Sequence, residues 1–299
     1  FPAIDPIYHY VFGTLIGIIG LAAVVANLIV ILVFTSSKKL RTLPTIFILN
    51  LAISDLTFSL ICALLLKTIS MFNTRWAFSA DLCIFYGLLG SVTGFVSLET
   101  NAMIAIERLM IIARPLGNLG KIDKYHRYLM VLLTWILAIA WSVPPLLGYG
   151  RIVLEGFHTH CSMDFISKDF GTKVYMTVIL GFGFCSNILI IGYCYTNVSL
   201  FLRRHEKEMC AFDRRRANYN RTELRATKVA FMCFAGFLFS WLPYAMTALL
   251  AILGKHEALT PFILEFPSLF TKTSALYNPI IYAISHPKFR KRLCKIVPF

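Results

Sequence analysis

Five ionisable residues stand in stretches of the sequence that are otherwise almost entirely apolar. They are Asp55 in LAISDL, Glu99 in SLETN, Glu107 and Arg108 in AIERL, and Lys272 in FTKTSALYNP. A charge removed from water costs on the order of a few kcal/mol or more, so each residue is a candidate functional residue. An amine in apolar surroundings either pairs with a buried carboxylate or condenses with a carbonyl compound to form a Schiff base. The position of Lys272 alone leaves both possibilities open.

Two proline-containing segments predict points where a helix bends. Pro279 follows Asn278 and precedes Tyr282, and Pro243 follows Trp241 by two residues. A proline removes a backbone donor and kinks a helix, and a neighbouring polar side chain can satisfy the backbone groups that are set free. We therefore expect flexible points at both prolines.

The composition identifies the environment of these residues. The chain has 299 residues, of which 58% are hydrophobic and only 15% charged, whereas soluble domains carry roughly 25% charge. A lipid bilayer accommodates such apolar surface and a soluble core does not, which excludes an ordinary soluble enzyme and a disordered tail. The net charge of +14 comes from bases that lie between the apolar runs. This pattern favours contact with anionic lipid over a nucleic-acid partner.

Seven apolar runs reach the roughly 20 residues that a helix needs to cross a bilayer. They are residues 9–34, 44–70, 80–112, 128–148, 173–202, 224–253 and 259–284. We therefore predict an all-α membrane protein, a seven-transmembrane helix bundle that forms a single domain over residues 1–299.

The distribution of bases predicts the orientation of the bundle. The segments 35–43, 113–127, 203–228 and 285–299 hold 21 Lys and Arg, against 5 in the remaining connections and the N-terminal segment. Basic loops face the cytoplasm, so we expect the N-terminus outside and the C-terminus inside. Residues 286–296 alternate bases with apolar residues and predict an amphipathic helix on the inner leaflet, where Cys294 is a candidate for palmitoylation.

Two further patterns concern the inner side of the bundle. Glu223, in TELRATK at the start of the sixth span, is a candidate partner for Arg108, and the alternative is that both charges only anchor their helices. HEKEM at 205–209 lacks the second His of a zinc-binding helix. We therefore expect no metal site there.

Together these residues resemble the rhodopsin-like family of G-protein-coupled receptors, and within it the opsins, over the whole chain. The residues that match family motifs are Asn27, Asp55, Cys83, Glu107-Arg108-Leu109, Trp135, Cys161, Tyr195, Trp241-Leu-Pro243-Tyr244 and Asn278-Pro279-Ile-Ile-Tyr282. The resemblance implies a disulfide between Cys83 and Cys161. It also implies an activation switch made of Asp55, Glu107, Arg108, Tyr195, Glu223, Asn278, Pro279 and Tyr282. The chain departs from the family at Asn187, where a Pro is usual, and at Leu109, which stands in the place of an aromatic residue.

Lys272 lies six residues before Asn278, where opsins attach retinal. The resemblance therefore implies retinal as a protonated Schiff base on Lys272, 11-cis in the dark and all-trans after light. It implies that Tyr86, Gly94, Trp241 and Tyr244 pack against the chromophore, although each residue also has a plain interpretation as core packing.

The resemblance also suggests where the counterion of the Schiff base lies. Tyr86 stands where vertebrate visual opsins carry a Glu, so the chain is similar to invertebrate and other bistable opsins. Glu155, six residues before Cys161, matches the counterion of that group. Asp81, Asp164 and Glu265 are the other outer acids to be tested.

The resemblance implies a light-sensing receptor that activates a heterotrimeric G protein, and not an enzyme. HEKEM and SHPKFR are similar to segments of rhabdomeric opsins, which favours Gq over Gi or Go. Arrestin is an expected partner, and a photoreceptor plasma membrane is the expected location. The alternative is a retinal photoisomerase of the retinochrome type. An ion pump would need a relay of carboxylates near Lys272, and a receptor for a diffusible ligand would leave that lysine free.

Overall fold

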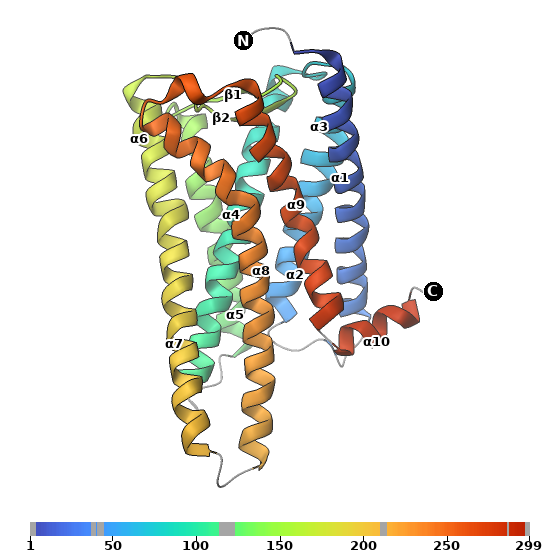
Figure 1. Ribbon diagram of the computed structural model, residues 1–299, viewed down its shortest axis with the longest axis vertical. Helices are drawn as coiled ribbons and strands as arrows, with labels where there is room; N and C mark the ends of the chain where they lie inside the picture. The colour runs from blue at the N-terminus through green and yellow to red at the C-terminus, as the bar shows by residue number, and fades with distance from the viewer. Residues whose placement is uncertain are drawn as a thin grey trace.

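The structure is a computed structural model that describes residues 4–36, 40, 45–113, 123–209, 214–285 and 287–296, without the side chains of 113, 202–223 and 287–288. Long helices run side by side along one axis (Figure 1). The single helices are α1 (Pro6–Thr35), α4 (Ala80–Ala113), α5 (Lys124–Ser142), α8 (Arg214–Ile252) and α9 (Pro261–Ser285). Two further spans contain a π-helical segment: α2 (Thr45–Thr57), η1 (Phe58–Leu65) and α3 (Leu66–Phe72), then α6 (Phe170–Val178), η4 (Ile179–Cys185) and α7 (Ser186–Met209).

The predicted seven-transmembrane bundle is confirmed. Five of its helical spans in the described residues are apolar enough to cross a membrane by composition alone. The other two, α5 and α9, pack against α4 and α8 within the same bundle (Figure 1). They are less apolar because α5 begins with Lys124 and contains Arg127, and α9 carries Glu265 and Lys272.

Acidic side chains begin three of the helices. Asp5 Oδ1 accepts a hydrogen bond from Ile7 N at 2.9 Å before α1, and Asp123 Oδ1 accepts one from His126 N at 2.8 Å before α5. Asp169 Oδ2 does the same for α6. Each carboxylate satisfies an amide that has no partner inside its helix, so these positions fix where the spans start.

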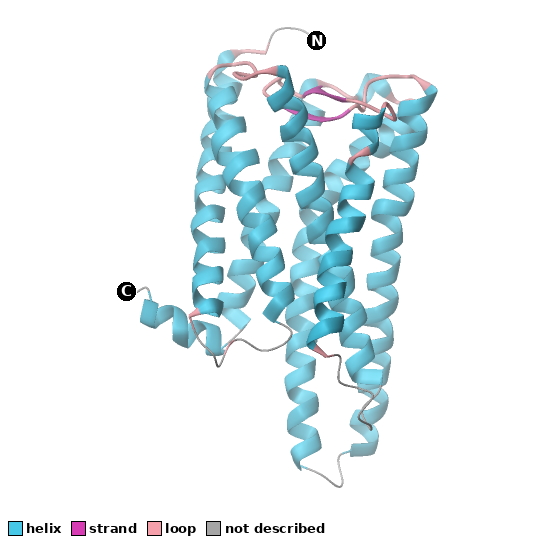
Figure 2. Cartoon of the chain, turned by 180° about the vertical axis from the view of Figure 1, so that it is seen from behind, coloured by secondary structure: helices cyan, strands magenta, loops and turns pink. Residues whose placement is uncertain are grey.

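A short hairpin, magenta in Figure 2, closes the end of the bundle at which the first helix begins, and we call this the outer end. Strands β1 (Ile152–Glu155) and β2 (His160–Met163) pair antiparallel, with Glu155 opposite His160. The expected disulfide between Cys83 and Cys161 is present and ties β2 to α4, with a Cα–Cα distance of 5.5 Å. The hairpin is therefore held down over the helices, as Figure 1 shows.

The predicted amphipathic helix is α10 (Pro287–Ile296), which leaves the bundle at its other, inner end (Figure 1). Phe289 is buried, with its ring 5.3 Å from that of Phe34 in α1. Leu293 and Ile296 pack against the same apolar cluster. Cys294 is exposed, so its thiol is accessible for the predicted lipidation.

The fifth span keeps a π-helical segment although Asn187 replaces the usual proline. Asn187 Nδ2 donates to the carbonyl oxygen of Gly183 at 2.8 Å and to Glu99 Oε1 at 3.0 Å. Trp141 Nε1 donates to the same Glu99 oxygen at 3.3 Å. The Asn187 amide thus adds a bond to a carbonyl within the π-helical segment. Glu99, whose role the sequence left open, joins three helical spans.

Candidate functional site

A cavity lies among α4, η4, α8 and α9, beneath the hairpin. Its walls are mostly apolar. The residues expected to surround a chromophore all line it: Tyr86, Gly94, Glu155, Trp241, Tyr244 and Lys272. Ligand sites in proteins are commonly apolar cavities with a few convergent polar groups, and this cavity has that character.

Lys272 projects from α9 into aromatic surroundings. Its side chain is buried, and Nζ lies 4.2 Å from the centre of the Phe58 ring and 5.5 Å from that of Tyr86. In the described part of the chain, no carboxylate oxygen lies within 4.0 Å of Nζ. The direct ion pair that the sequence left open is therefore not formed with any described residue, and the amine faces a space that can hold a carbonyl compound.

Trp241 fills the inner part of the cavity wall because Gly94 leaves room for it. A Cβ atom at Gly94 would lie 2.4 Å from Trp241 Cη2, closer than real Cβ contacts. The indole stacks on Phe237, with ring centres 5.6 Å apart. Trp241 Nε1 is buried without a hydrogen-bond partner among the described residues, so a polar atom on this wall is unsatisfied.

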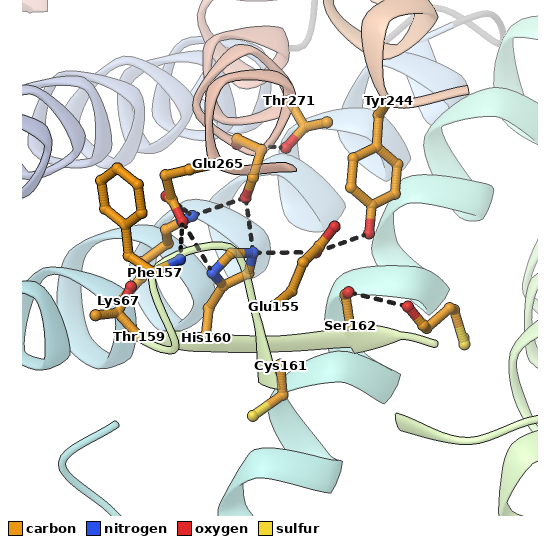
Figure 3. A network of polar contacts seen from close by, with 12 residues as sticks. Lys67, Glu155, Phe157, Thr159, His160, Cys161, Ser162, Tyr244, Glu265 and Thr271 are labelled. Carbon is orange, nitrogen blue, oxygen red and sulfur yellow. Dashed lines mark hydrogen bonds and ion pairs between the residues drawn. The ribbon is translucent and has the colours of Figure 1, made fainter. Parts of the chain in front are cut away.

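Glu155, the last residue of β1, is buried and lines the cavity. Figure 3 shows its carboxylate between His160 and Tyr244. Its Oε2 accepts a hydrogen bond from Tyr244 Oη at 3.2 Å and lies 3.2 Å from His160 Nε2. Its Oε1 has no hydrogen-bond partner in the described residues. Burial raises the pKa of Glu155 to about 7, because the charged form loses its hydration. A cation in the cavity would reverse this effect and favour the carboxylate.

The other outer acids differ in their surroundings. Asp81 is exposed, and Asp164 Oδ1 accepts hydrogen bonds from the amides of Ile166 and Ser167, both at 2.9 Å. Glu265 is buried and lies 2.7 Å from Lys67 Nζ. Of the four candidates, Glu155 is the one that lines the cavity.

Sequence reasoning missed Lys67. This lysine is close to the outer end of the predicted span 44–70, where a long side chain normally reaches water. In the structure its side chain is fully buried and bonded to Glu265 and to Ser268 Oγ, the latter at 2.7 Å. A single Lys in the apolar run ALLLKTIS was the available signal.

Asp55 connects three helices in the middle of the bundle. Asn278 Nδ2 of α9 donates to Asp55 Oδ2 at 2.9 Å, and Ser97 of α4 donates to Oδ1 at 3.2 Å. Asn278 immediately precedes Pro279, and Tyr282 is buried one turn further on. The predicted flexible point in α9 is therefore bonded directly to the predicted polar residue of α2.

Near the inner end, Glu107 holds two arginines. Its carboxylate accepts a hydrogen bond from Arg108 at 2.5 Å and another from Arg127 of α5. All three side chains are buried. The side chain of Glu223, the expected partner of Arg108, lies outside the described residues, and Arg127 was not anticipated from the sequence.

Tyr195, the remaining predicted switch residue with a described side chain, lies in the fifth span. It is buried, and its ring meets that of Phe231 in α8 edge to face at 5.4 Å. It therefore joins the fifth span to α8, the helix that contains Trp241 and Pro243.

Comparison with known proteins agrees with this arrangement. Residues 26–282 match the family described as "7 transmembrane receptor (rhodopsin family)". All of the chain aligns with "Rhodopsin, GQ-coupled" of Mizuhopecten yessoensis at 38% identity and with "Rhodopsin" of Enteroctopus dofleini at 40%. It also aligns over its full length with "Melanopsin" of Felis catus at 35%. The chain spans 62%, 67% and 63% of the lengths of these three relatives.

The fold gives the same result. The chain superposes on the crystal structure of squid rhodopsin with a TM-score of 0.94 and 39% identity, covering 99% of this chain and 87% of that one. The family match extends over most of the chain and includes the helices that carry Asp55, Arg108, Lys272 and Asn278. The chain therefore belongs to the rhodopsin family of seven-transmembrane receptors.

Proposed function

We propose that this chain is a light-sensing G-protein-coupled receptor that binds retinal covalently at Lys272 as a protonated Schiff base. The observation that carries the proposal is a buried lysine amine facing an apolar, aromatic cavity. Relatives along the whole chain are named rhodopsins and melanopsins, which favours retinal over other carbonyl compounds.

The cavity has the features that retinal requires. Retinal is a long polyene with one aldehyde group, so it needs apolar walls and an amine at one end. When bound, it supplies light absorption and a change of shape, from 11-cis in the dark to all-trans after light. The proposed contacts are Tyr86, Gly94, Trp241 and Tyr244, all of which line the space beside Lys272.

Glu155 is proposed as the counterion. A protonated Schiff base is a cation without water, and burial alone would drive its proton off. Tyr86 carries no charge near neutral pH and therefore cannot compensate it. Glu155 Oε1 has no hydrogen-bond partner among the residues that the structure describes, while Tyr244 and His160 contact its other oxygen. It can stabilise the cation directly or through a bridging water.

The residues below the cavity are proposed to pass a change of its shape to the inner end. Trp241 is confined between Gly94 and Phe237, so a change in the occupied space displaces the indole. Displacement lets α8 swing about Pro243, since proline interrupts its backbone hydrogen bonds. Such a switch depends on two discrete packings of the same helices.

The inner polar contacts are proposed to hold the resting arrangement. Asp55 holds Asn278 beside the bend at Pro279, and Glu107 holds Arg108 within the bundle. Release of Arg108 would open a cleft for a G protein. Glu223, Tyr195 and Tyr282 complete the proposed switch.

The proposed partner is a heterotrimeric G protein, with Gq favoured and Gi or Go as the alternative. The name of the Mizuhopecten relative states Gq coupling. Arrestin is proposed as a second partner, and the plasma membrane of a photoreceptor cell as the location. The surrounding lipid contacts the exposed apolar faces of the helices.

A retinal photoisomerase of the retinochrome type is the competing function. It would share Lys272 and the cavity, but it has no need for the buried Glu107–Arg108 contact. The test is light-dependent nucleotide exchange on purified Gq and Gi with the retinal-reconstituted protein, followed by extraction of the retinal isomers. We expect faster exchange on Gq after illumination. Isomerised retinal without exchange on any G protein would favour the photoisomerase.

A further inference from the structure

A chain of buried polar side chains links Lys67 to Glu155 (Figure 3). Lys67 Nζ lies 2.7 Å from Glu265 Oε1 and donates to Ser268 Oγ, also at 2.7 Å. Ser268 Oγ lies 3.0 Å from His160 Nε2, which in turn lies 3.2 Å from Glu155 Oε2. His160 Nδ1 lies 3.5 Å from Glu265 Oε2. The imidazole therefore stands between the two carboxylates.

This cluster borders the cavity. Ser268, His160 and Glu155 line it together with Lys272. Ser268 is one helical turn before Lys272 on α9, and Glu265 is about two turns before it, roughly 10 Å along the axis at 1.5 Å per residue. The charges of the cluster thus lie close enough to act on a charge at Lys272.

Because this site is buried, its charged groups must be compensated by one another and not by water. Lys67 and Glu265 are fully buried, and Glu155 and His160 are only 3% and 2% exposed. Burial lowers the pKa of His160 well below its usual range, so the imidazole is neutral. Two amines, Lys67 and Lys272, then face two carboxylates, Glu155 and Glu265.

Stability alone does not explain the Lys67–Glu265 pair, because a buried ion pair is often no more stable than an apolar pair of the same size. The pair does, however, assign one carboxylate to each amine: Glu265 to Lys67, and Glu155 to Lys272. Lys67 Nζ forms an ion pair with Glu265 Oε1 at 2.7 Å, whereas Glu155 Oε1 has neither an ion pair nor a hydrogen bond to any described residue.

We propose that Lys67 holds Glu265 out of the counterion role and thereby fixes Glu155 as the single carboxylate that balances a cation on Lys272. Lys67 is in this sense a positioning residue, which acts through Glu265 and His160. The inference rests on the proposed function, that is, on retinal at Lys272 with Glu155 as its counterion.

The titratable and charged groups that face this cluster come from every element around it. Among the described residues they are Lys67 of α3, Cys62 of η1, Tyr86 of α4, Glu155 of β1, His160 of β2, Tyr244 of α8, Glu265 and Lys272 of α9, and His9 of α1, which is buried beside Phe157. Among them, only Lys67 and Glu265 form an ion pair between a basic and an acidic side chain that are both fully buried.

The proposal predicts opposite effects for the two partners. Lys67→Met leaves the Glu265 carboxylate uncompensated, about 10 Å from Lys272 along α9. The Schiff-base pKa should therefore rise by about one unit, the effect of one charge at that distance in a medium of effective dielectric constant near 20. Glu265→Gln leaves Lys67 uncompensated, so the Schiff-base pKa should fall by a similar amount. The double variant Lys67→Met/Glu265→Gln should titrate like the unmodified pigment.

The decisive experiment places these changes in the Glu155→Gln background. The visible band of each pigment is titrated with pH, and the Schiff-base pKa is its midpoint. Lys67→Met should restore part of the visible band that Glu155→Gln loses at neutral pH. Lys255→Met, which changes an exposed outer lysine, should restore none. An unchanged or lower midpoint after Lys67→Met would overturn the proposal.

Two further measurements keep the test decisive if Lys67→Met folds poorly. Lys67→Arg retains the charge and should keep the original midpoint, and the double variant removes both buried charges together. In the apoprotein, the infrared band of the protonated Glu155 carboxyl should titrate at higher pH after Lys67→Met. An apoprotein in which Lys67→Met leaves that titration unchanged counts against the proposal. A chain that forms no pigment at all would instead refute the proposed function.

Discussion

The apoprotein is expected to lose stability as the pH rises, and Glu155 is the cause that the structure identifies. Burial raises the pKa of this carboxyl from 4.5 to about 7, so the folded state favours its neutral form. The unfolded chain ionises near 4.5 and the folded chain near 7. The stabilisation is complete below pH 4.5, falls between 4.5 and 7, and is absent above 7.

The size of the effect follows from that shift. A difference of about 2.5 pKa units corresponds to about 3 kcal/mol at 1.36 kcal/mol per unit. Glu155→Gln replaces the carboxyl with an amide that does not titrate and retains an oxygen for Tyr244. The variant should therefore lack this part of the pH dependence.

The assay is thermal unfolding of the retinal-free protein in detergent micelles at several pH values from 4.5 to 8. The measured quantity is the difference between the original protein and Glu155→Gln, because other groups titrate equally in both. We expect the free-energy difference to change by about 3 kcal/mol over this range. Parallel pH profiles for the two proteins would refute the assignment of a buried, neutral carboxyl at this position.

The pigment should respond in a related way. Glu155→Gln removes the proposed counterion, so the visible band should move into the near ultraviolet at neutral or mildly alkaline pH. Tyr86→Phe should leave the dark pigment protonated, because the phenol carries no charge. An unshifted visible band for Glu155→Gln in chloride-free buffer would place the counterion elsewhere.

Two further predictions concern the inner switch and the cavity wall. Glu107→Gln weakens the charged hydrogen bonds to Arg108 and Arg127, each worth about 1.5–3 kcal/mol. Nucleotide exchange in the dark should therefore rise by about 10-fold or more. An unchanged dark rate would contradict the proposed restraint. Gly94→Ala places a Cβ 2.4 Å from Trp241 Cη2, so the indole must move. The visible absorption band of the reconstituted pigment should therefore be displaced, or less pigment should form.

Matched controls separate these effects from general damage. Gly192→Ala adds the same methyl group on an exposed residue that does not line the cavity, where no heavy atom of the described residues would lie within 4 Å, and it should leave the spectrum unchanged. Glu257→Gln neutralises an exposed acid of the outer side and should leave the dark exchange rate unchanged. A spectrum of Gly94→Ala identical to that of Gly192→Ala would contradict the proposed packing of Trp241.

The sequence predicted what depends on local composition. Apolar runs of sufficient length indicated the helices, and the alternation around Phe289 indicated the amphipathic helix that α10 forms. Lys272 was recognisable because its amine lies too far from either end of its span to reach water. Such features need only the chain itself and the thickness of a bilayer.

Contacts between distant segments were not predictable in the same way. Lys67 and Glu265 are 198 positions apart, and each alone resembles an interfacial charge. Arg127 resembles an ordinary base at the start of a helix, yet it turns inward to Glu107. The π-helical segment before Asn187 contains no proline from which it could have been predicted. In each case the outcome depends on which partner the fold brings near.

The central claim is that retinal is bound to Lys272, and it can be tested by locating the bond. The protein is reconstituted with 11-cis-retinal in the dark, reduced with borohydride, digested, and mapped by mass spectrometry, with Lys272→Ala as the control. We expect the retinyl group on the peptide that contains Lys272, and no visible pigment from the folded Lys272→Ala apoprotein. A retinyl group on Lys67, or a normal pigment in Lys272→Ala, would contradict the proposed site.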